Sequence, residues 1–335
     1  MAIKSYSLND VEEKDLTPMK WAVPDLIPVG LTCVAAKQKT GKSYLMLGVA
    51  ISIAKGTIAL GKIPVQKKEV LYLSFEDGKR RVHQRATEMT DAFPDALQIA
   101  HEMQPLGYGG LDELEEYRLE HPELGMVIID TIVSVEAHEK GADPRAEVYR
   151  ELGPLQKWSL ENDIATVFVT HLHRAKEDRD PQDAIYGSSG YAQISDAILL
   201  MDRPRNTNEA KLTVSGRDIP DKEYALHFDD TLGSWTIASD PGMLAILNLP
   251  QEQARLVAAI RETPDITPGQ LAKKLGKSIG SVDQLLREAR EKKTVVSNKG
   301  KYRIMEKEPV AAGVRSNGYD PEPIDMDAFD DYDPD

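Results

Sequence analysis

Short apolar runs alternate with longer amphipathic stretches between residues 20 and 240. The runs are nearly continuous in Val, Ile, Leu and Ala, which is typical of strands covered on both faces. Six such runs predict strands at residues 31–36, 69–75, 97–103, 125–130, 164–171 and 196–202. Because helical patterns separate them, the sequence predicts an α/β fold with a mostly parallel sheet flanked by helices.

Two further segments, "EAKLTVSGRD" and "YALHFDDTLGSWTI", alternate more loosely between apolar and polar positions. This pattern favours an antiparallel extension at one edge of the sheet. We therefore assign residues 1–19 to an N-terminal extension, 20–240 to the α/β core and 241–250 to a linker.

The pattern changes to three amphipathic helices after residue 251, in "QEQARLVAAIRE", "TPGQLAKKLG" and "SIGSVDQLLREAREK". Thr267 before Pro268, and Ser278 before the third helix, are helix start signals. Two short strands around an Asn-Lys-Gly turn follow, so residues 251–305 are predicted to form a winged helix-turn-helix whose third helix reads a DNA groove. Residues 306–335 are rich in Asp and Pro and poor in large apolar residues, which predicts a disordered acidic tail.

Charge is distributed unevenly along this chain of 335 residues, whose formal net charge is −14. Residues 251–305 carry twelve basic against six acidic side chains, whereas residues 319–335 carry eight carboxylates and no base. The overall acidity therefore does not exclude a nucleic-acid partner, because a basic module precedes the acidic tail.

Several protein classes are excluded by composition. No run of about 18 apolar residues occurs, and the N-terminus lacks the pattern of a signal peptide, so we expect a cytoplasmic protein without a membrane partner. The single cysteine, Cys33, excludes an intrachain disulfide and a cysteine-rich zinc module.

The stretch "AAKQKTGKSYLML" follows the first predicted strand and matches most of the phosphate-binding pattern G-x-x-x-x-G-K-[ST]. Ala36 stands where the pattern has its first glycine, which is harmless if that residue keeps a negative φ. Loop amides and the helix N-terminus would face the phosphates, with Lys42 on the outer pair and Ser43 on Mg²⁺. The predicted nucleotide-binding residues are Ala36, Lys37, Gln38, Lys39, Thr40, Gly41, Lys42, Ser43 and Tyr44. Alternatively, Gly-Lys-Ser is a coincidence at a helix start.

A second carboxylate supports this nucleotide site. The apolar strand "GMVIIDTI" ends in Asp130, which is placed to reach Mg²⁺ through water, together with Ser43. The alternative is that Asp130 only caps the strand end. With the loop upstream, the pair predicts binding of ATP and Mg²⁺.

Further motifs occur in a characteristic order: "VLYLSFED", "VIIDTI", "VFVTHLHR", "YGSSG" and "VSGRD". Together with the phosphate loop they resemble the RecA-type ATPases of the plasmid RepA helicase family, which are kin of the hexameric DnaB helicases. The resemblance covers residues 20 to 237, about two thirds of the chain. It implies ATP hydrolysis, a homo-oligomeric ring of six subunits and single-stranded DNA as partner.

The resemblance also implies roles for two polar residues at strand ends. Glu76 takes the place of the carboxylate that activates the attacking water, and we assign Asp77 as the cap of the next helix. The alternative is that Glu76 and Asp77 both only start that helix. His171 takes the place of the residue that senses the γ-phosphate and signals to a DNA-binding loop, here residues 174–190. His171 and His173 are spaced two apart as metal ligands can be, but no third ligand stands near.

A neighbouring subunit supplies an arginine to the γ-phosphate in this family. The strand "KLTVSGRD" aligns best with the one that carries it, so the resemblance assigns this role to Arg217, with Arg203 and Arg205 as reserves. A surface ion pair between Arg217 and Asp218 or Asp221 is the alternative.

The sequence thus favours an ATP-driven helicase that moves on single-stranded DNA in plasmid or phage replication. Two other functions stay open: a recombination or repair ATPase with the same core, and a DNA-binding regulator whose assembly is switched by ATP. The basic module binds DNA or docks a protein. The acidic tail recruits a replication protein, competes with DNA, or serves solubility alone.

Overall fold

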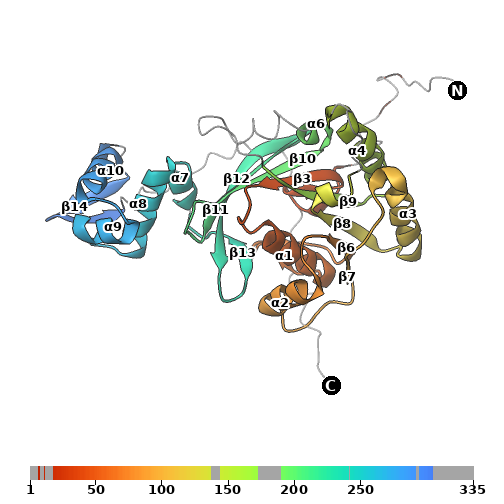
Figure 1. Ribbon diagram of the computed structural model, residues 1–335, viewed down its shortest axis with the longest axis horizontal. Coiled ribbons are helices and arrows are strands. Elements are labelled where there is room, and N and C mark those ends of the chain that lie inside the picture. The colour runs from red at the N-terminus through yellow and green to blue at the C-terminus, as the bar shows by residue number, and fades with distance from the viewer. Residues whose placement is uncertain are drawn as a thin grey trace.

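The computed structural model describes residues 18–136, 144–172, 190–240, 242–291 and 294–304, together with Ser7 and Val11 (Figure 1). The predicted acidic tail, most of the N-terminal extension and most of the predicted DNA loop lie outside these ranges. Within them, an α/β core is followed by a smaller helical unit, which lies at the left of Figure 1.

A nine-stranded mixed sheet forms the centre of the core, with the strand order β13-β12-β11-β10-β3-β9-β8-β6-β7. Its six parallel strands are β3 (Gly30–Ala36), β6 (Glu69–Ser74), β7 (Leu97–Ala100), β8 (Leu124–Asp130), β9 (Ala165–His171) and β10 (Ala197–Asp202). Its antiparallel strands are β11 (Glu209–Gly216), β12 (Ile219–Asp229) and β13 (Ser234–Ile237). The predicted fold class and the antiparallel edge are confirmed, although β7 ends at Ala100 rather than at residue 103.

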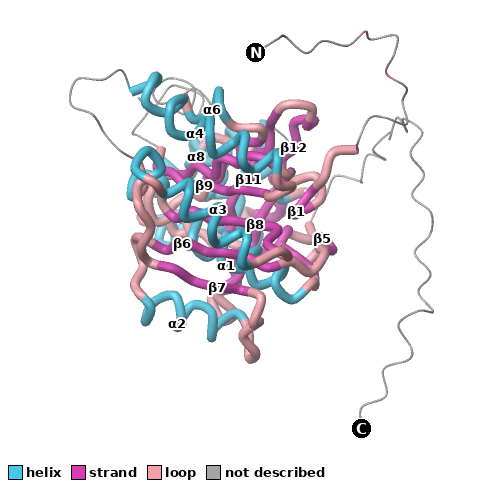
Figure 2. The backbone as a smooth tube through the Cα atoms, turned by 90° about the vertical axis from the view of Figure 1, so that its right-hand side faces the viewer, coloured by secondary structure: helices cyan, strands magenta, loops and turns pink. Residues whose placement is uncertain are grey.

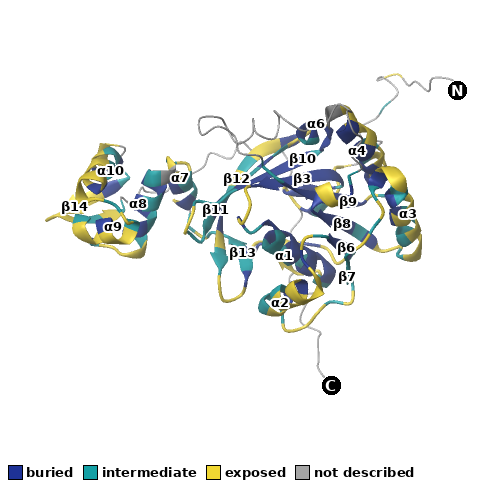
Figure 3. Cartoon of the chain, in the orientation of Figure 1, coloured by how far each residue is buried: buried dark blue, intermediate teal, exposed yellow. Residues whose placement is uncertain are grey.

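Helices cover both faces of the sheet, as the continuous apolar runs predict (Figure 2). One face packs against α1 (Lys42–Lys55) and α2 (Lys79–Met89), and the other against α3 (Gly110–Glu120), α4 (Pro144–Glu161) and α6 (Tyr191–Ile194). Strand β3 lies at the centre: Val34 and Ala36 enter the first core, and Leu31 and Cys33 enter the second. The buried strands are dark blue in Figure 3.

Short elements complete the core. They are the hairpin of β1 (Trp21–Val23) and β2 (Ile27–Pro28), the hairpin of β4 (Ile58–Ala59) and β5 (Ile63–Pro64), and the 3₁₀ turns η3 (Leu106–Tyr108) and η4 (Ile132–Ser134). No helix in the described part of the chain is both long enough and apolar enough to cross a bilayer.

The smaller unit consists of α8 (Gln251–Glu262), α9 (Pro268–Leu275), α10 (Ile279–Glu291) and the hairpin of β14 (Val295–Asn298) and β15 (Lys301–Ile304). Both helix start signals are present. Thr267 forms a capping box with Gln270, and the Ser278 hydroxyl accepts a hydrogen bond of 3.2 Å from the Ser281 amide. Helix α7 (Met243–Leu247) lies within the predicted linker and packs between this unit and β12, where Ala225 joins the same apolar core.

Candidate nucleotide site

The phosphate loop joins the end of β3 to the start of α1. Two of its residues have left-handed backbone: Gly41, with φ 100°, and Lys39, with φ 62°. Ala36 is the last residue of β3 and has no positive φ, so the glycine of the common pattern is not needed here. The Thr40 hydroxyl donates to the Lys37 carbonyl at 2.9 Å and closes the loop. The side chains of Lys37, Gln38 and Lys39 are exposed.

Lys42 is buried within this loop and its ammonium has three partners. It donates to the carbonyls of Ala36 and Lys37, each at 3.1 Å, and lies 2.9 Å from Nδ1 of His171. Burial lowers the pKa of Lys42 to about 8, although Asp130 and Glu76 act in the opposite direction. A phosphate brought to this loop would supply a stronger counter-charge than these neutral partners do.

His171 links Lys42 to Glu76. Its Nε2 lies 3.1 Å from Oε1 of Glu76, while its Nδ1 faces Lys42. With Nδ1 accepting from the ammonium, Nε2 carries the proton and donates to the carboxylate. Glu76 also accepts a hydrogen bond of 3.3 Å from the hydroxyl of Thr131. The ends of β3, β6, β8 and β9 therefore bring together three of the four predicted catalytic residues, Lys42, His171 and Glu76.

Asp130 is almost fully buried at the end of β8. Its Oδ2 accepts a hydrogen bond of 2.7 Å from the Tyr72 hydroxyl, whereas its Oδ1 is buried and has no hydrogen-bond partner among the described residues. Burial raises the pKa of Asp130, and the Tyr72 and Ser43 hydroxyls lower it in part. The alternative role of Asp130, capping the strand end, does not match its contacts, because its partners are side chains.

These residues fit a hydrated Mg²⁺. An unpartnered, buried carboxylate oxygen is costly unless a cation or its water occupies the remaining valence, and Mg²⁺ prefers oxygen ligands. The Ser43 hydroxyl is close enough to Asp130 to affect its pKa, as the predicted pair requires. No group of three or more His, Cys, Asp or Glu in the described ranges could hold a metal ion by itself, so a cation here would depend on Asp130, the Ser43 hydroxyl, water and phosphate oxygens.

Asp77 does not cap helix α2, which corrects the prediction from the sequence. The N-cap is Gly78, and no side chain bonds to the first turn. The buried Asp77 carboxylate instead pairs with Arg81, at 2.7 Å, and with Arg85. Arg85 lies over the Tyr44 ring, 4.6 Å from its centroid, so this ion pair joins α2 to the start of α1.

Arg217 lies at the opposite end of the sheet from the phosphate loop. Gly216 pairs with Ala197, which pairs with Thr32 near the start of β3. The Arg217 guanidinium donates to the Gln193 carbonyl at 2.7 Å and lies 3.7 Å from Asp196, and its side chain is 58% exposed. Its ion pair is therefore with Asp196 and not with Asp218 or Asp221.

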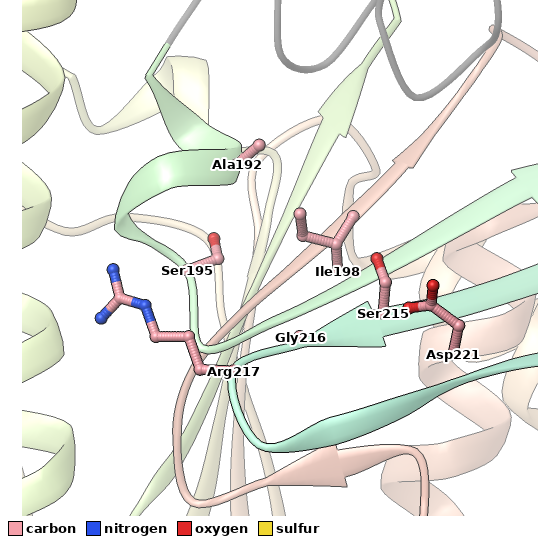
Figure 4. Close-up of a pocket in the computed structure, with 7 residues that line it drawn as sticks. All are labelled: Ala192, Ser195, Ile198, Ser215, Gly216, Arg217 and Asp221. Atoms are coloured by element: carbon pink, nitrogen blue, oxygen red, sulfur yellow. The ribbon is translucent and has the colours of Figure 1, made fainter.

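Arg217 borders a cavity of about 270 Å³ between α6 and the turn after β11. Figure 4 shows the side chains of Arg217 and Asp221 on opposite sides of Gly216, with the Arg217 guanidinium turned away from the other labelled side chains. Arg203, an alternative candidate for the same role, makes different contacts. It donates to the Thr207 carbonyl at 2.8 Å and lies over the rings of Phe228 and Trp235.

Several residues of this site were not predicted from the sequence. Tyr72, Thr131 and Trp235 each contact a predicted site residue. Tyr72 could have been found from the sequence, because a tyrosine within a buried strand needs a polar partner for its hydroxyl. His173, Arg174, Lys176 and Arg179 lie outside the described residues.

Tyr72→Phe tests whether the tyrosine stabilises the buried carboxylate. Removing the hydroxyl leaves Asp130 short of a donor, so we expect the free energy of unfolding at pH 7 to fall by about 1–3 kcal/mol in urea denaturation. Tyr149→Phe is the matched control, because its hydroxyl donates to Gln193 at the exposed surface. Equal stability of the two variants would contradict the role of Tyr72.

Comparison with known proteins identifies a family and a fold. Residues 2–177, more than half of the chain, match the family model described as the AAA domain. No curated protein matches the sequence.

Two solved structures share the fold. One is an ATPase domain that is 16% identical, with a TM-score of 0.51 over 63% of this chain and 85% of that chain. The other is a structure of a DnaB-like replicative helicase and its interactions with primase, which is 17% identical, with a TM-score of 0.50 over 62% of this chain and 57% of that chain. At these identities the likeness establishes a RecA-like core and no more.

Proposed function

The chain belongs to the AAA domain family, and from this premise we propose that it is an ATP-dependent DNA motor, specifically a RepA-type replicative helicase of plasmid or phage replication. The observation that carries the proposal is the contact of Lys42 and Glu76 with the same histidine, His171, beside the buried Asp130. A protein that only binds nucleotide needs the lysine but does not need a carboxylate held next to it.

Each residue of this cluster has a chemical task in hydrolysis. Lys42 and the loop amides bind the β- and γ-phosphates. Ser43, and Asp130 through water, would hold Mg²⁺, whose charge would offset that of the phosphates. Glu76 accepts the proton of the attacking water. The Glu76 side chain is exposed just after β6, where water can reach it. Hydrogen bonds from Thr131 and His171 to the same oxygen, Oε1, orient the carboxylate.

His171 is the proposed link between hydrolysis and DNA. It contacts both Lys42 and Glu76, and it is followed directly by the segment proposed to bind DNA, residues 174–190. When the ammonium of Lys42 turns to a phosphate, His171 loses one of its two partners. The position of the imidazole ring would then depend on whether a phosphate is bound.

Arg217 is proposed to complete the site of a neighbouring subunit. It is exposed, and it lies at the far end of β3, a strand of seven residues that spans roughly 20 Å. It is therefore far from the phosphate loop of its own chain, as an arginine acting across an interface has to be. This supports a homo-oligomeric ring, for which we propose six subunits.

The helical unit at the C-terminus is proposed to be a winged helix that contacts DNA phosphates. Lys274, Lys277 and Arg303 are paired with Glu262, Glu252 and Asp265. Other exposed cations of the unit have no ion pair within the described residues: Lys273, Arg287, Arg290, Lys299 and Lys301. Unpaired cations on one small unit favour phosphate contact over a purely structural role.

The test is hydrolysis of ATP by the wild-type protein with and without single-stranded DNA, together with strand displacement on a forked duplex. We expect several-fold stimulation by single-stranded DNA, little by blunt duplex DNA of equal length, and displacement only with hydrolysable ATP. Stimulation without displacement would favour the recombination or repair ATPase. Hydrolysis indifferent to DNA would contradict a motor and favour the ATP-switched regulator.

A further inference from the structure

Trp235 on the edge strand β13 touches the phosphate loop from a distant part of the chain. Its indole N–H donates to the Gly41 carbonyl at 3.1 Å, across 194 positions of sequence. The same carbonyl accepts the Leu45 amide at 3.0 Å, which is the first hydrogen bond of α1. The indole therefore binds the residue at which the loop becomes the helix.

The indole also lies directly against the α-carbon of Gly41. A β-carbon at this position would stand 2.9 Å from Nε1 of Trp235, closer than such atoms approach one another, and 3.0 Å from Cζ2, which is also a tight contact. Gly41 is thus required twice, once for its φ of 100° and once for this contact. The contact restricts movement of the loop on the side that faces β13.

The Trp235 side chain is buried and packs against Phe228 and Arg203. It is 4% exposed, and its ring lies 5.0 Å from that of Phe228, its partner on β12. The guanidinium of Arg203 lies over both rings, 5.0 Å from the centroid of Trp235 and 5.2 Å from that of Phe228. Arg203 is fixed in turn by the Thr207 carbonyl and the Asn208 side chain. These contacts restrict the movement of the indole, so the indole can in turn restrict the movement of Gly41.

We propose that Trp235 is a positioning residue for the phosphate loop: it holds Gly41 in the conformation that presents Lys42 and the loop amides to the phosphates of a nucleotide. The proposal rests on the proposed function, since it assumes that a nucleotide binds at this loop. A preformed loop binds more tightly because less conformational entropy is lost on binding.

The first test compares MgADP affinity of the full chain by calorimetry for wild type, Trp235→Phe and Trp158→Phe. The phenyl ring keeps the packing and lacks the N–H donor, so we expect Trp235→Phe to weaken binding about 3- to 10-fold, as the loss of one neutral hydrogen bond does. Trp158 is the matched control: it is buried, and its indole donates to Glu115 at 2.8 Å on α3, away from the loop. We expect Trp158→Phe to bind as wild type does.

The second test is spectroscopic and leaves Trp235 unchanged. The chain has three tryptophans, so Trp21→Phe combined with Trp158→Phe leaves Trp235 as the only tryptophan, and selective excitation of the indole reports on it alone. We expect MgADP to change its emission with the same dissociation constant as calorimetry gives.

The results distinguish the positioning role of Trp235 from nucleotide binding at the phosphate loop. Binding by the wild type with equal affinity in Trp235→Phe, or with unchanged emission of Trp235, would overturn the positioning role and leave the nucleotide site standing. A wild-type protein that binds no nucleotide would overturn both.

Discussion

Lys42→Ala is expected to lower kcat/KM for ATP hydrolysis by about 100-fold or more, as does the loss of one charged group that stabilises a transition state. The ammonium is placed inside the phosphate loop by two carbonyls and His171, and alanine at this position cannot contact a phosphate. Release of phosphate, measured at saturating Mg²⁺ over a range of ATP concentrations, gives the value directly.

The matched control for Lys42→Ala is Lys68→Ala. Lys68 is exposed and pairs with Glu123 at 3.2 Å on the surface, so its removal should leave hydrolysis unchanged. Thermal unfolding of both variants separates a loss of activity from a loss of structure. A Lys42→Ala protein that is folded and hydrolyses ATP at the wild-type rate would show that this loop is not the nucleotide site.

Glu76→Gln is expected to lower kcat by about 10²- to 10⁴-fold, the usual range for the loss of a general base, while MgATP still binds. The amide keeps the shape of the side chain and can still accept from Thr131, but it cannot take a proton from water. Single-turnover hydrolysis and calorimetric binding with the same preparation measure the two effects.

Glu123→Gln serves as control for Glu76→Gln, because it makes the same chemical change on an exposed ion pair. Parallel losses of binding and hydrolysis in Glu76→Gln would mean that the carboxylate supports the site structurally. Wild-type turnover in this variant would assign the general base to another residue.

The apolar runs located the parallel strands β3, β6, β8, β9 and β10 because these strands are covered on both faces and are therefore nearly continuous in apolar residues. The edge strand β7 is only partly buried, and its predicted end lies three residues beyond the observed one. Strand β3 is buried along its whole length, and its predicted bounds differ from the observed ones by one residue. The helix starts at Thr267 and Ser278 were also predictable, because each capping partner lies only three residues away in the sequence.

Contacts between distant segments could not be predicted in this way. Asp77 precedes a helix, as a cap would, but Arg81 and Arg85 hold its carboxylate instead. Trp235 gave no signal at all, because β12, β11 and β10 separate β13 from β3 in the sheet. Only the packing of β13 against α1, visible in Figure 1, brings the indole to Gly41.

The three internal partners of Lys42 also bear on how the protein would release its product. A phosphate that binds this ammonium exchanges with the carbonyls of Ala36 and Lys37 and with His171, so only the difference between the two sets of contacts contributes to affinity. When the phosphate leaves, the same partners take the ammonium back. A nucleotide site built in this way would limit how tightly ADP is retained, and would therefore favour repeated turnover over storage of bound nucleotide.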